Sequence, residues 1–304
     1  MLSEGTSDRL VAIGECMVEL ANAGDGLYAQ GFAGDTFNTA WHFARHAPRG
    51  WKAAYLTALG TDRMSQEMLG FFAKAGIETD AVRRIPAASP GLYMIHLKDG
   101  ERSFSYWREM AAARQLAADD AHLASVFATG GAFYVSGITL AILPQEDRGR
   151  LIDHLGHAKL AGRMVAFDPN IRARLWPDMD SARSAVEAAA RVSTLCLPSF
   201  DDEKAAFGDE TPEATAARYH ALGLAEVVVK DGGGAAFVSW DDGRQSESVP
   251  CIVPEKIVDT TGAGDSFNAA YLAARLGGEG PVEATLAGHR LASRVVGGHG
   301  ALGG

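Results

Sequence analysis

The residues with the clearest chemical meaning lie late in the chain, in the stretch 258–267, VDTTGAGDSF. Its glycines, Gly262 and Gly264, stand where a turn opens into a segment with helical spacing of apolar residues. Unpaired N–H groups at a helix start attract anions, and a residue without a Cβ lets a phosphate approach the backbone closely. Asp265 then lies where a phosphoryl group would bind, placed to accept a proton from an attacking hydroxyl. The stretch therefore predicts phosphoryl transfer.

The same position has a consequence for the basicity of Asp265. The positive end of a helix lowers the pKa of a carboxyl group, so we expect Asp265 to be a weak base. Phosphoryl transfer demands mostly positioning and charge stabilisation, for which a weak, well-aimed base suffices. The alternative is that Asp265 only caps a helix and the glycines only turn the chain. Two other nucleotide motifs are missing: the sequence has no Gly-x₄-Gly-Lys-Ser/Thr and no third glycine for a dinucleotide fingerprint.

The elements that must position this stretch alternate along the chain. Strand-like runs fall at 10–13, 53–59, 132–135, 164–167, 194–197 and 227–229, and helical periodicity follows at 36–44, 65–75, 146–159, 181–191 and 212–222. Such alternation predicts a mostly parallel sheet with helices on both faces. Residues 235–243 end in Asp-Asp-Gly and predict a late antiparallel hairpin.

A second hairpin is predicted by two β-rich runs, 92–97 and 103–107, that flank an Asp-Gly pair at 99–100. A two-residue type I′ turn there pairs Lys98 with Glu101 and sets Tyr93 opposite Tyr106. Arg108 lies two residues beyond Tyr106, so it projects from the same face. The hairpin is expected to present two tyrosines and an arginine together.

Composition excludes several classes of function. The formal net charge of −10 disfavours nucleic acid and anionic membranes as main partners, since both need a basic surface. The three cysteines, Cys16, Cys196 and Cys251, have neither disulfide nor zinc-ligand spacing. No run approaches the roughly 18 apolar residues of a membrane span, and residues 1–8 are polar, unlike a signal peptide. We expect a cytoplasmic protein.

The stretch 259–267, DTTGAGDSF, resembles the C-terminal signature of the ribokinase-like (PfkB) carbohydrate kinases. The resemblance implies that Asp265 is the catalytic base and that the amides of Gly262, Ala263 and Gly264 form the anion hole. It also implies ATP and Mg²⁺, and a three-layer α/β/α sandwich with a mostly parallel central sheet. Residues 1–304 would form one kinase domain, with a small β-sheet lid from roughly 15–35 and 90–108. In such kinases the lid is often a subunit contact, which implies a homo-oligomer.

Other stretches resemble the nucleotide-binding parts of that family. Residues 230–234, KDGGG, resemble its Lys-x-Gly-x-x-Gly loop, although Ala235 holds the place of the final glycine. Ser199 and Asp202 stand where many members carry Asn-x-x-Glu, so Asp202 would hold a water of the Mg²⁺ shell; a solvated acid at a helix start is the alternative. The sequence leaves open whether a monovalent cation takes part. The residues implied for the nucleotide are Asn170, Arg172, Ser199, Lys230, Gly232, Gly234, Gly262, Gly264 and His289.

Within the family, the stretches 14–17, 34–39, 106–108 and 168–172 are similar to the subfamily that phosphorylates 2-keto-3-deoxygluconate. The substrate residues this implies are Gly34, Asp35, Asn38, Tyr93, Tyr106, Arg108, Arg172 and Asp265. Charge supports the assignment, because a sugar acid needs a cation and guanidinium groups bind carboxylates bidentately.

Simpler roles remain open for these residues, since either arginine could form a surface ion pair and the tyrosines could merely pack across strands. Rival functions are a kinase of a neutral sugar such as fructose or ribose, a sugar-binding protein of this fold without catalysis and, more distantly, a nicotinamide dehydrogenase.

Overall fold

A ten-stranded sheet forms the centre of the computed structural model, which describes residues 7–98 and 101–303. Its strand order is β14-β13-β12-β11-β10-β9-β1-β4-β5, and β6 also pairs with β4. All pairs between β12 and β5 or β6 are parallel, whereas β13 and β14 are antiparallel. The strands are β1 (Arg9–Ile13), β4 (Lys52–Leu59), β5 (Ile77–Glu78), β6 (Val82–Arg84), β9 (Ala132–Ser136), β10 (Met164–Asp168), β11 (Leu195–Cys196), β12 (Glu226–Val229), β13 (Ala236–Trp240) and β14 (Gln245–Val249).

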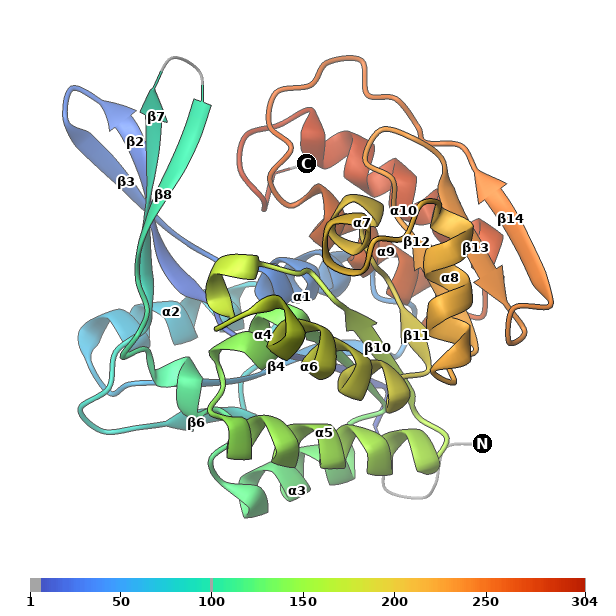
Figure 1. The fold of residues 1–304 in the computed structure, drawn as a ribbon. Helices are drawn as coiled ribbons and strands as arrows, with labels where there is room; N and C mark the ends of the chain where they lie inside the picture. The colour runs from blue at the N-terminus through green and yellow to red at the C-terminus, as the bar shows by residue number, and fades with distance from the viewer. Residues whose placement is uncertain (1–6, 99–100, 304) are drawn as a thin grey trace.

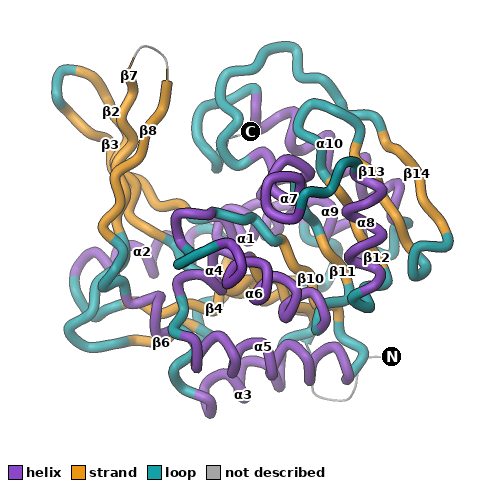
Figure 2. Tube along the Cα trace, in the orientation of Figure 1, coloured by secondary structure: helices purple, strands orange, loops and turns teal. Residues whose placement is uncertain are grey.

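Helices cover both faces of this sheet, as Figure 2 shows. On one face, a core around Phe37, Tyr55 and Phe72 packs under α1 (Asp35–His46), α2 (Arg63–Lys74), α9 (Ala263–Leu276) and α10 (Pro281–Val296). A core around Phe133 and Phe167 lies on the opposite face. It packs under α3 (Asp120–Thr129), α4 (Gly137–Ile142), α5 (Gln145–Leu160), α6 (Met179–Arg191), α7 (Phe200–Phe207) and α8 (Pro212–Ala221). The expected α/β sandwich and the late β13–β14 hairpin are confirmed.

A smaller four-stranded sheet, called the lid below, stands apart from the main body at the upper left of Figure 1. Its order is β3-β2-β7-β8, with β2 (Met17–Gly24), β3 (Leu27–Ala33), β7 (Leu92–Lys98) and β8 (Glu101–Trp107). The predicted register of β7 and β8 is confirmed, since Tyr93 pairs with Tyr106 and Lys98 with Glu101. The predicted turn residues 99–100 lie outside the described residues.

The burial of the central parallel strands agrees with their position in the middle of the sheet. All residues of β1, β9 and β12 are buried, as expected for strands covered on both faces. The chain leaves β9, β10 and β12 at Ser136, Asp168 and Val229, and these parallel strands all point toward the same edge of the sheet. Open α/β sheets place their ligands at that edge. Within residues 7–98 and 101–303, no helix is long and apolar enough to cross a bilayer.

Candidate active site

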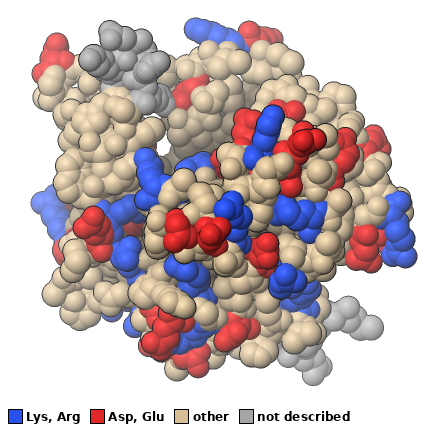
Figure 3. Space-filling view, in the orientation of Figure 1, with Lys and Arg blue, Asp and Glu red and all other residues tan. Residues whose placement is uncertain are grey.

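A cavity of ≈ 730 Å³ lies between the carboxyl edge of the large sheet, the lid and the start of α9. The surface is hollowed between the lid and the main body in Figure 3. Lid residues such as Met17 and Tyr106 line it together with Asp265 and the 260–264 turn. The predicted chemistry-bearing segments, far apart in the sequence, therefore share one cavity.

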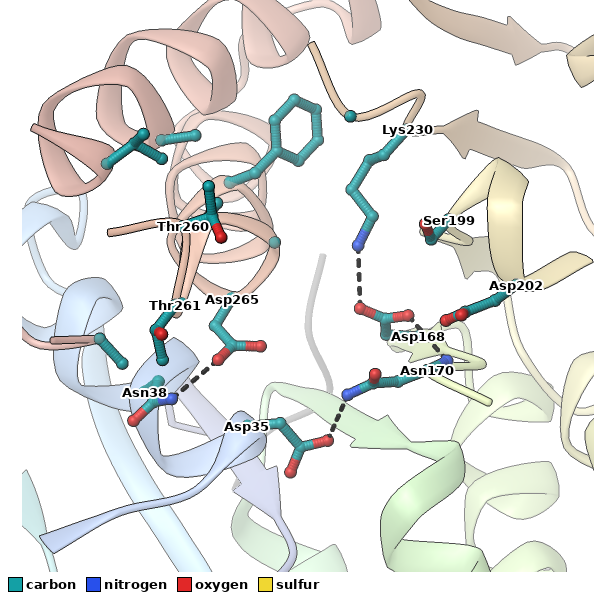
Figure 4. A pocket seen from close by; sticks show the side chains of 18 of the residues that line it. Asp35, Asn38, Asp168, Asn170, Ser199, Asp202, Lys230, Thr260, Thr261 and Asp265 are labelled. Atoms are coloured by element: carbon teal, nitrogen blue, oxygen red, sulfur yellow. Dashed lines mark hydrogen bonds and ion pairs between the residues drawn. The ribbon is translucent and has the colours of Figure 1, made fainter. Parts of the chain in front are cut away.

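Asp265 occupies the first turn of α9 and opens into this cavity. Its Oδ2 accepts a hydrogen bond of 2.8 Å from Asn38 Nδ2, and its carbonyl oxygen accepts one of 3.2 Å from Thr39 Oγ1. Both donors belong to α1. The carboxylate is thus fixed by a neighbouring helix and keeps an oxygen facing the cavity (Figure 4).

The expectation of a lowered pKa for Asp265 is wrong. Burial away from water, and then the nearby Asp35 carboxylate, raise the pKa of Asp265 to about 8. The hydrogen bond from Asn38 and the charge of Lys230 act in the opposite direction but are weaker. Desolvation therefore dominates over the helix end, and Asp265 is a stronger base than its sequence position predicts.

The turn before α9 has the backbone shape that the glycines predict. Gly262 caps the helix with φ 77°, and a Cβ there would lie 2.7 Å from Ala301 Cα. Gly264 is exposed to the cavity, and a Cβ on it would stand 3.8 Å from Lys230 Nζ. The amide of Ala263 donates to the Thr260 carbonyl at 3.2 Å, so this amide is shared with the turn.

Asp35 and Asn170 form a second polar pair on the cavity wall. Asn170 Nδ2 donates to Asp35 Oδ2 at 2.8 Å, and burial raises the pKa of Asp35. Asn170 has φ 35°, a left-handed conformation that asparagine tolerates, held by a bond of 3.1 Å from its amide to Asp168 Oδ1. Asn170, expected beside the nucleotide, is therefore tied in this structure to Asp35, an expected sugar ligand.

Lys230 is anchored by a buried network that the sequence did not reveal. Its ammonium group donates to Asp168 Oδ2 and Asn268 Oδ1, both at 2.9 Å. Asn268 Nδ2 in turn donates to Asp168 Oδ2 at 2.6 Å and to Tyr134 Oη at 3.0 Å. The network fixes one positive charge close to Gly264 on the cavity wall.

Lys230, Ser199 and Asp202 lie across the cavity from Thr260, Thr261 and Asp265 (Figure 4). Ser199 caps α7, and Asp202 lies in the first turn of that helix. Asp202 Oδ2 accepts a bond of 3.0 Å from Arg172 Nη1. Burial raises the pKa of Asp202, against the opposing charge of Arg172. The two residues, predicted for different ligands, are thus partners of each other.

The remaining residues expected at the nucleotide are the glycines of the 230–234 loop and His289. Gly232 (φ 51°) and Gly233 line the cavity, whereas Gly234 lies outside its lining and turns the loop through a bond from its amide to Asp231 O at 2.6 Å. His289 lines the cavity and is buried; its ring packs edge-on against Phe267 at 5.2 Å. Burial lowers the pKa of His289, which favours a neutral ring.

The lid contributes Tyr93 and Tyr106, whose rings stack 5.9 Å apart and line the cavity. Tyr93 Oη donates to Glu19. The guanidinium of Arg174, a residue that the motifs did not single out, lies 4.2 Å from the centre of the Tyr106 ring and so bridges main body and lid. Arg108, expected to face the substrate with these tyrosines, is buried outside the cavity lining and paired with Glu15.

Comparisons with known proteins agree with this geometry. The sequence profile of the pfkB family carbohydrate kinases matches residues 7–303. The chain belongs to the pfkB family of carbohydrate kinases. It is 41% identical to the 2-dehydro-3-deoxygluconokinase of Dickeya dadantii, covering 98% of this chain and 97% of that one, and 38% identical to that of Escherichia coli K12, covering 97% of each. The crystal structure of a fructokinase with bound ATP from Xylella fastidiosa superposes with a TM-score of 0.83 at 20% identity, covering 97% of this chain and 94% of that one.

The pfkB kinase presents carboxylates suited to a metal ion that arrives with phosphates. Within the described part of the chain, no cluster of three or more His, Cys, Asp or Glu side chains could hold a metal by itself. Nucleotide-bound Mg²⁺ keeps several waters and uses one or two protein carboxylates. Asp168 and Asp202 line the cavity on the Lys230 side and fit that need.

Sequence reasoning missed Asn268, Tyr134 and Arg174. Asn268 follows Asp265 by three residues, so helical spacing places it on the same side of α9 and was a usable signal. Nothing in the sequence links Tyr134 or Arg174 to the site, because each is connected to it only through a tertiary contact, Tyr134 with Asn268 and Arg174 with Tyr106.

Proposed function

We propose that this kinase transfers the terminal phosphoryl group of ATP to the terminal hydroxyl of 2-keto-3-deoxygluconate, giving the 6-phosphate. The observation that carries the proposal is the placement of Asp265, which faces the cavity from the first turn of α9 and is held by Asn38. Support for the sugar acid comes from the two relatives named 2-dehydro-3-deoxygluconokinase, which match over nearly their full length.

In the proposed reaction, the sugar hydroxyl oxygen forms a bond to the γ-phosphorus while the bond from that phosphorus to the bridging oxygen breaks. Asp265 takes the hydroxyl proton, and the electron pair of the broken bond stays on the departing ADP. The raised pKa of Asp265 suits this role, since a base acts best when its pKa is near the working pH. Asn38 orients the carboxylate of Asp265 through its hydrogen bond.

Negative charge on the migrating group is stabilised by the Gly264 amide at the start of α9 and by the ammonium group of Lys230. Mg²⁺, held through the phosphates and the Asp202 side of the cavity, would neutralise further charge. Gly232 and His289 are proposed to flank the nucleotide.

The sugar acid is proposed to lie between the lid and Asp35, with Tyr93 and Tyr106 above it and Gly34 below. Its hydroxyls would bond Asp35 and Asn38, and its carboxylate would bind Arg108 or Arg172, with Arg174 near Tyr106 as a further cation. Gly34 is required there, because a Cβ would lie 2.1 Å from the Glu15 carbonyl oxygen.

A neutral sugar is the second candidate substrate, since Arg108 and Arg172 both hold carboxylate partners within the protein. A coupled assay of ADP formation with 2-keto-3-deoxygluconate, gluconate, fructose and ribose separates the two. We expect a preference of about 10- to 100-fold for the keto acid over fructose and ribose in kcat/KM, because a hydrogen bond to a charged group contributes about 1.5–3 kcal/mol. A preference for fructose or ribose would still agree with kinase activity but would contradict the proposed substrate.

The same assay on Arg108→Ala tests the carboxylate contact. Loss of a charged hydrogen bond predicts a rise in KM for the keto acid of about 10- to 100-fold, with a smaller change for ATP. Lys74→Met, which removes a cation at the far end of α2, is the control.

We also propose that the kinase is a cytoplasmic homo-oligomer joined through its lid. Leu27 and Tyr28 of β3 and Trp107 of β8 are exposed by 66%, 41% and 57%, so both edge strands of the lid present apolar side chains to solvent. Light scattering after size exclusion would reveal a mass above 32.1 kDa if this holds.

A further inference from the structure

Glu15 stands where the chain crosses between the main body and the lid. It lies between β1 and β2, and Arg108 directly follows β8. A Cβ built on Gly91, which precedes β7, would lie 2.6 Å from Glu15 Oε1 and 3.2 Å from Arg108 Cβ. Gly34, between β3 and α1, packs on the Glu15 backbone. The four crossings between lid and main body therefore meet around the Glu15–Arg108 pair, a region called the lid root below. Figure 1 shows where the lid joins the main body.

The pair is buried but incompletely bonded. Glu15 is 3% exposed and Arg108 9%, and Arg108 Nη2 donates to Glu15 Oε2. Glu15 Oε1 and Arg108 Nε are buried without a hydrogen-bond partner. Buried ion pairs are stable when the remaining donors and acceptors are satisfied. An unsatisfied donor on Arg108 marks it as able to take a second acceptor.

A carboxylate bound in the cavity would lie close to Arg108. Tyr106, two residues before Arg108, lines the cavity, as does Met17, two residues after Glu15. Gly34, in contact with the Glu15 backbone, lines it as well. The pair thus lies one layer behind the wall where the substrate's carboxylate is proposed to bind.

Charge decides what happens when a carboxylate arrives. The titratable and charged groups that act on or are acted on by Glu15 are Arg108, Asp35 of α1, Arg114 of the short helix Ala112–Gln115, Cys16 and Tyr55 of β4. If two carboxylates bind one buried guanidinium, the group carries a net negative charge away from water, which costs free energy. Burial already raises the pKa of Glu15, against the opposing charge of Arg108, so weakening the pair favours its neutral form.

We propose that Glu15 is a positioning residue, which holds Arg108 at the lid root in the empty enzyme and yields it to the carboxylate of the bound sugar acid. Glu15 takes up a proton from solvent as it does so and remains buried without charge. This inference rests on the proposed function. It explains why Arg108 lies outside the cavity lining although its register points toward the tyrosines.

Calorimetric titration with 2-keto-3-deoxygluconate at pH 7, in buffers of different ionisation enthalpy, measures the proton uptake. It is carried out without nucleotide in an Asp265→Asn background, so that Asp265 contributes no proton. We expect a fractional uptake of up to about one proton per sugar. Adding Glu15→Gln should abolish it and tighten binding about 3- to 10-fold, because the competing carboxylate is gone. Glu78→Gln, beside Arg9 and remote from the lid, should change neither quantity.

The outcomes separate the two proposals. If the wild type does not phosphorylate the keto acid, the proposed function fails and takes this inference with it. If the keto acid is phosphorylated and binds with no proton uptake, or if Glu15→Gln leaves uptake and affinity unchanged, only the exchange is overturned. Should Glu15→Gln fail to fold, the uptake in the Asp265→Asn protein and its loss in an added Arg108→Gln decide the matter.

Discussion

Asn38 Nδ2 donates to Asp265 Oδ2 at 2.8 Å, although the two residues are 227 positions apart. The bond joins the first turn of α1, directly after the lid, to the first turn of α9, directly after the glycine turn. It therefore links the wall that faces the sugar with the proposed base. Any movement of the lid that carries α1 with it would change the aim of Asp265.

Replacing Asp265 by Asn should abolish most turnover while leaving binding intact. Loss of a general base predicts a fall in kcat of about 10²- to 10⁴-fold, with little change in the affinity for the keto acid. Steady-state kinetics and calorimetry measure the two quantities. Asp180→Asn, in the exposed first turn of α6, should behave as wild type. Turnover of Asp265→Asn at the normal rate would exclude the proposed mechanism.

The pH profile of kcat/KM should have an acid limb well above the ordinary range of an aspartate. Asp265 works as a base only when deprotonated and its pKa is raised, so activity should fall as the pH drops through that value. Asn38→Ala removes a bond that favours the charged form and should move the limb to higher pH, by up to about one unit. Asp35→Asn removes a repelling charge and should move it to lower pH. Shifts in the same direction for both variants would contradict the assignment.

Gly262→Ala should damage the anion hole through steric conflict. A Cβ at this position would meet Ala301 Cα at 2.7 Å on top of the left-handed backbone, so the turn must shift. Gly278→Ala is the matched control, because φ is 93° there and nothing lies within 4 Å. We expect activity to fall at least about 100-fold for Gly262→Ala alone, while both variants lose stability of roughly 1 kcal/mol or more from backbone strain. Equal kinetics for the two variants would remove Gly262 from the site.

Lys230→Met should lower kcat about 10²-fold or more, since it deletes the positive charge nearest to Gly264. It also leaves the buried Asp168 carboxylate without its cationic partner, which should lower the melting temperature. Adding Asp168→Asn should restore much of the stability but not the rate. Recovery of the rate in the double variant would assign Lys230 a structural role only.

Much of this arrangement follows from the sequence because it is local. The alternation of strands and helices and the glycine turn before α9 depend on neighbouring residues, and the pairing of Tyr93 with Tyr106 depends on the short segment between the two strands. Turn chemistry and periodicity are sufficient to decide such features. The segment 259–267 alone indicated the class of chemistry.

Only the tertiary structure decided the partners of the charged groups. Helix position predicted a weak base at Asp265, whereas burial and Asp35, brought in by the fold, raise its pKa. Strand register directed Arg108 toward the tyrosines, but Glu15, 93 positions away, holds its guanidinium at the lid root. Likewise Arg172 donates a hydrogen bond to Asp202, and Lys230 donates to Asp168 and Asn268. Desolvation and ion pairing depend on which distant segments pack together, and no local pattern contains that information.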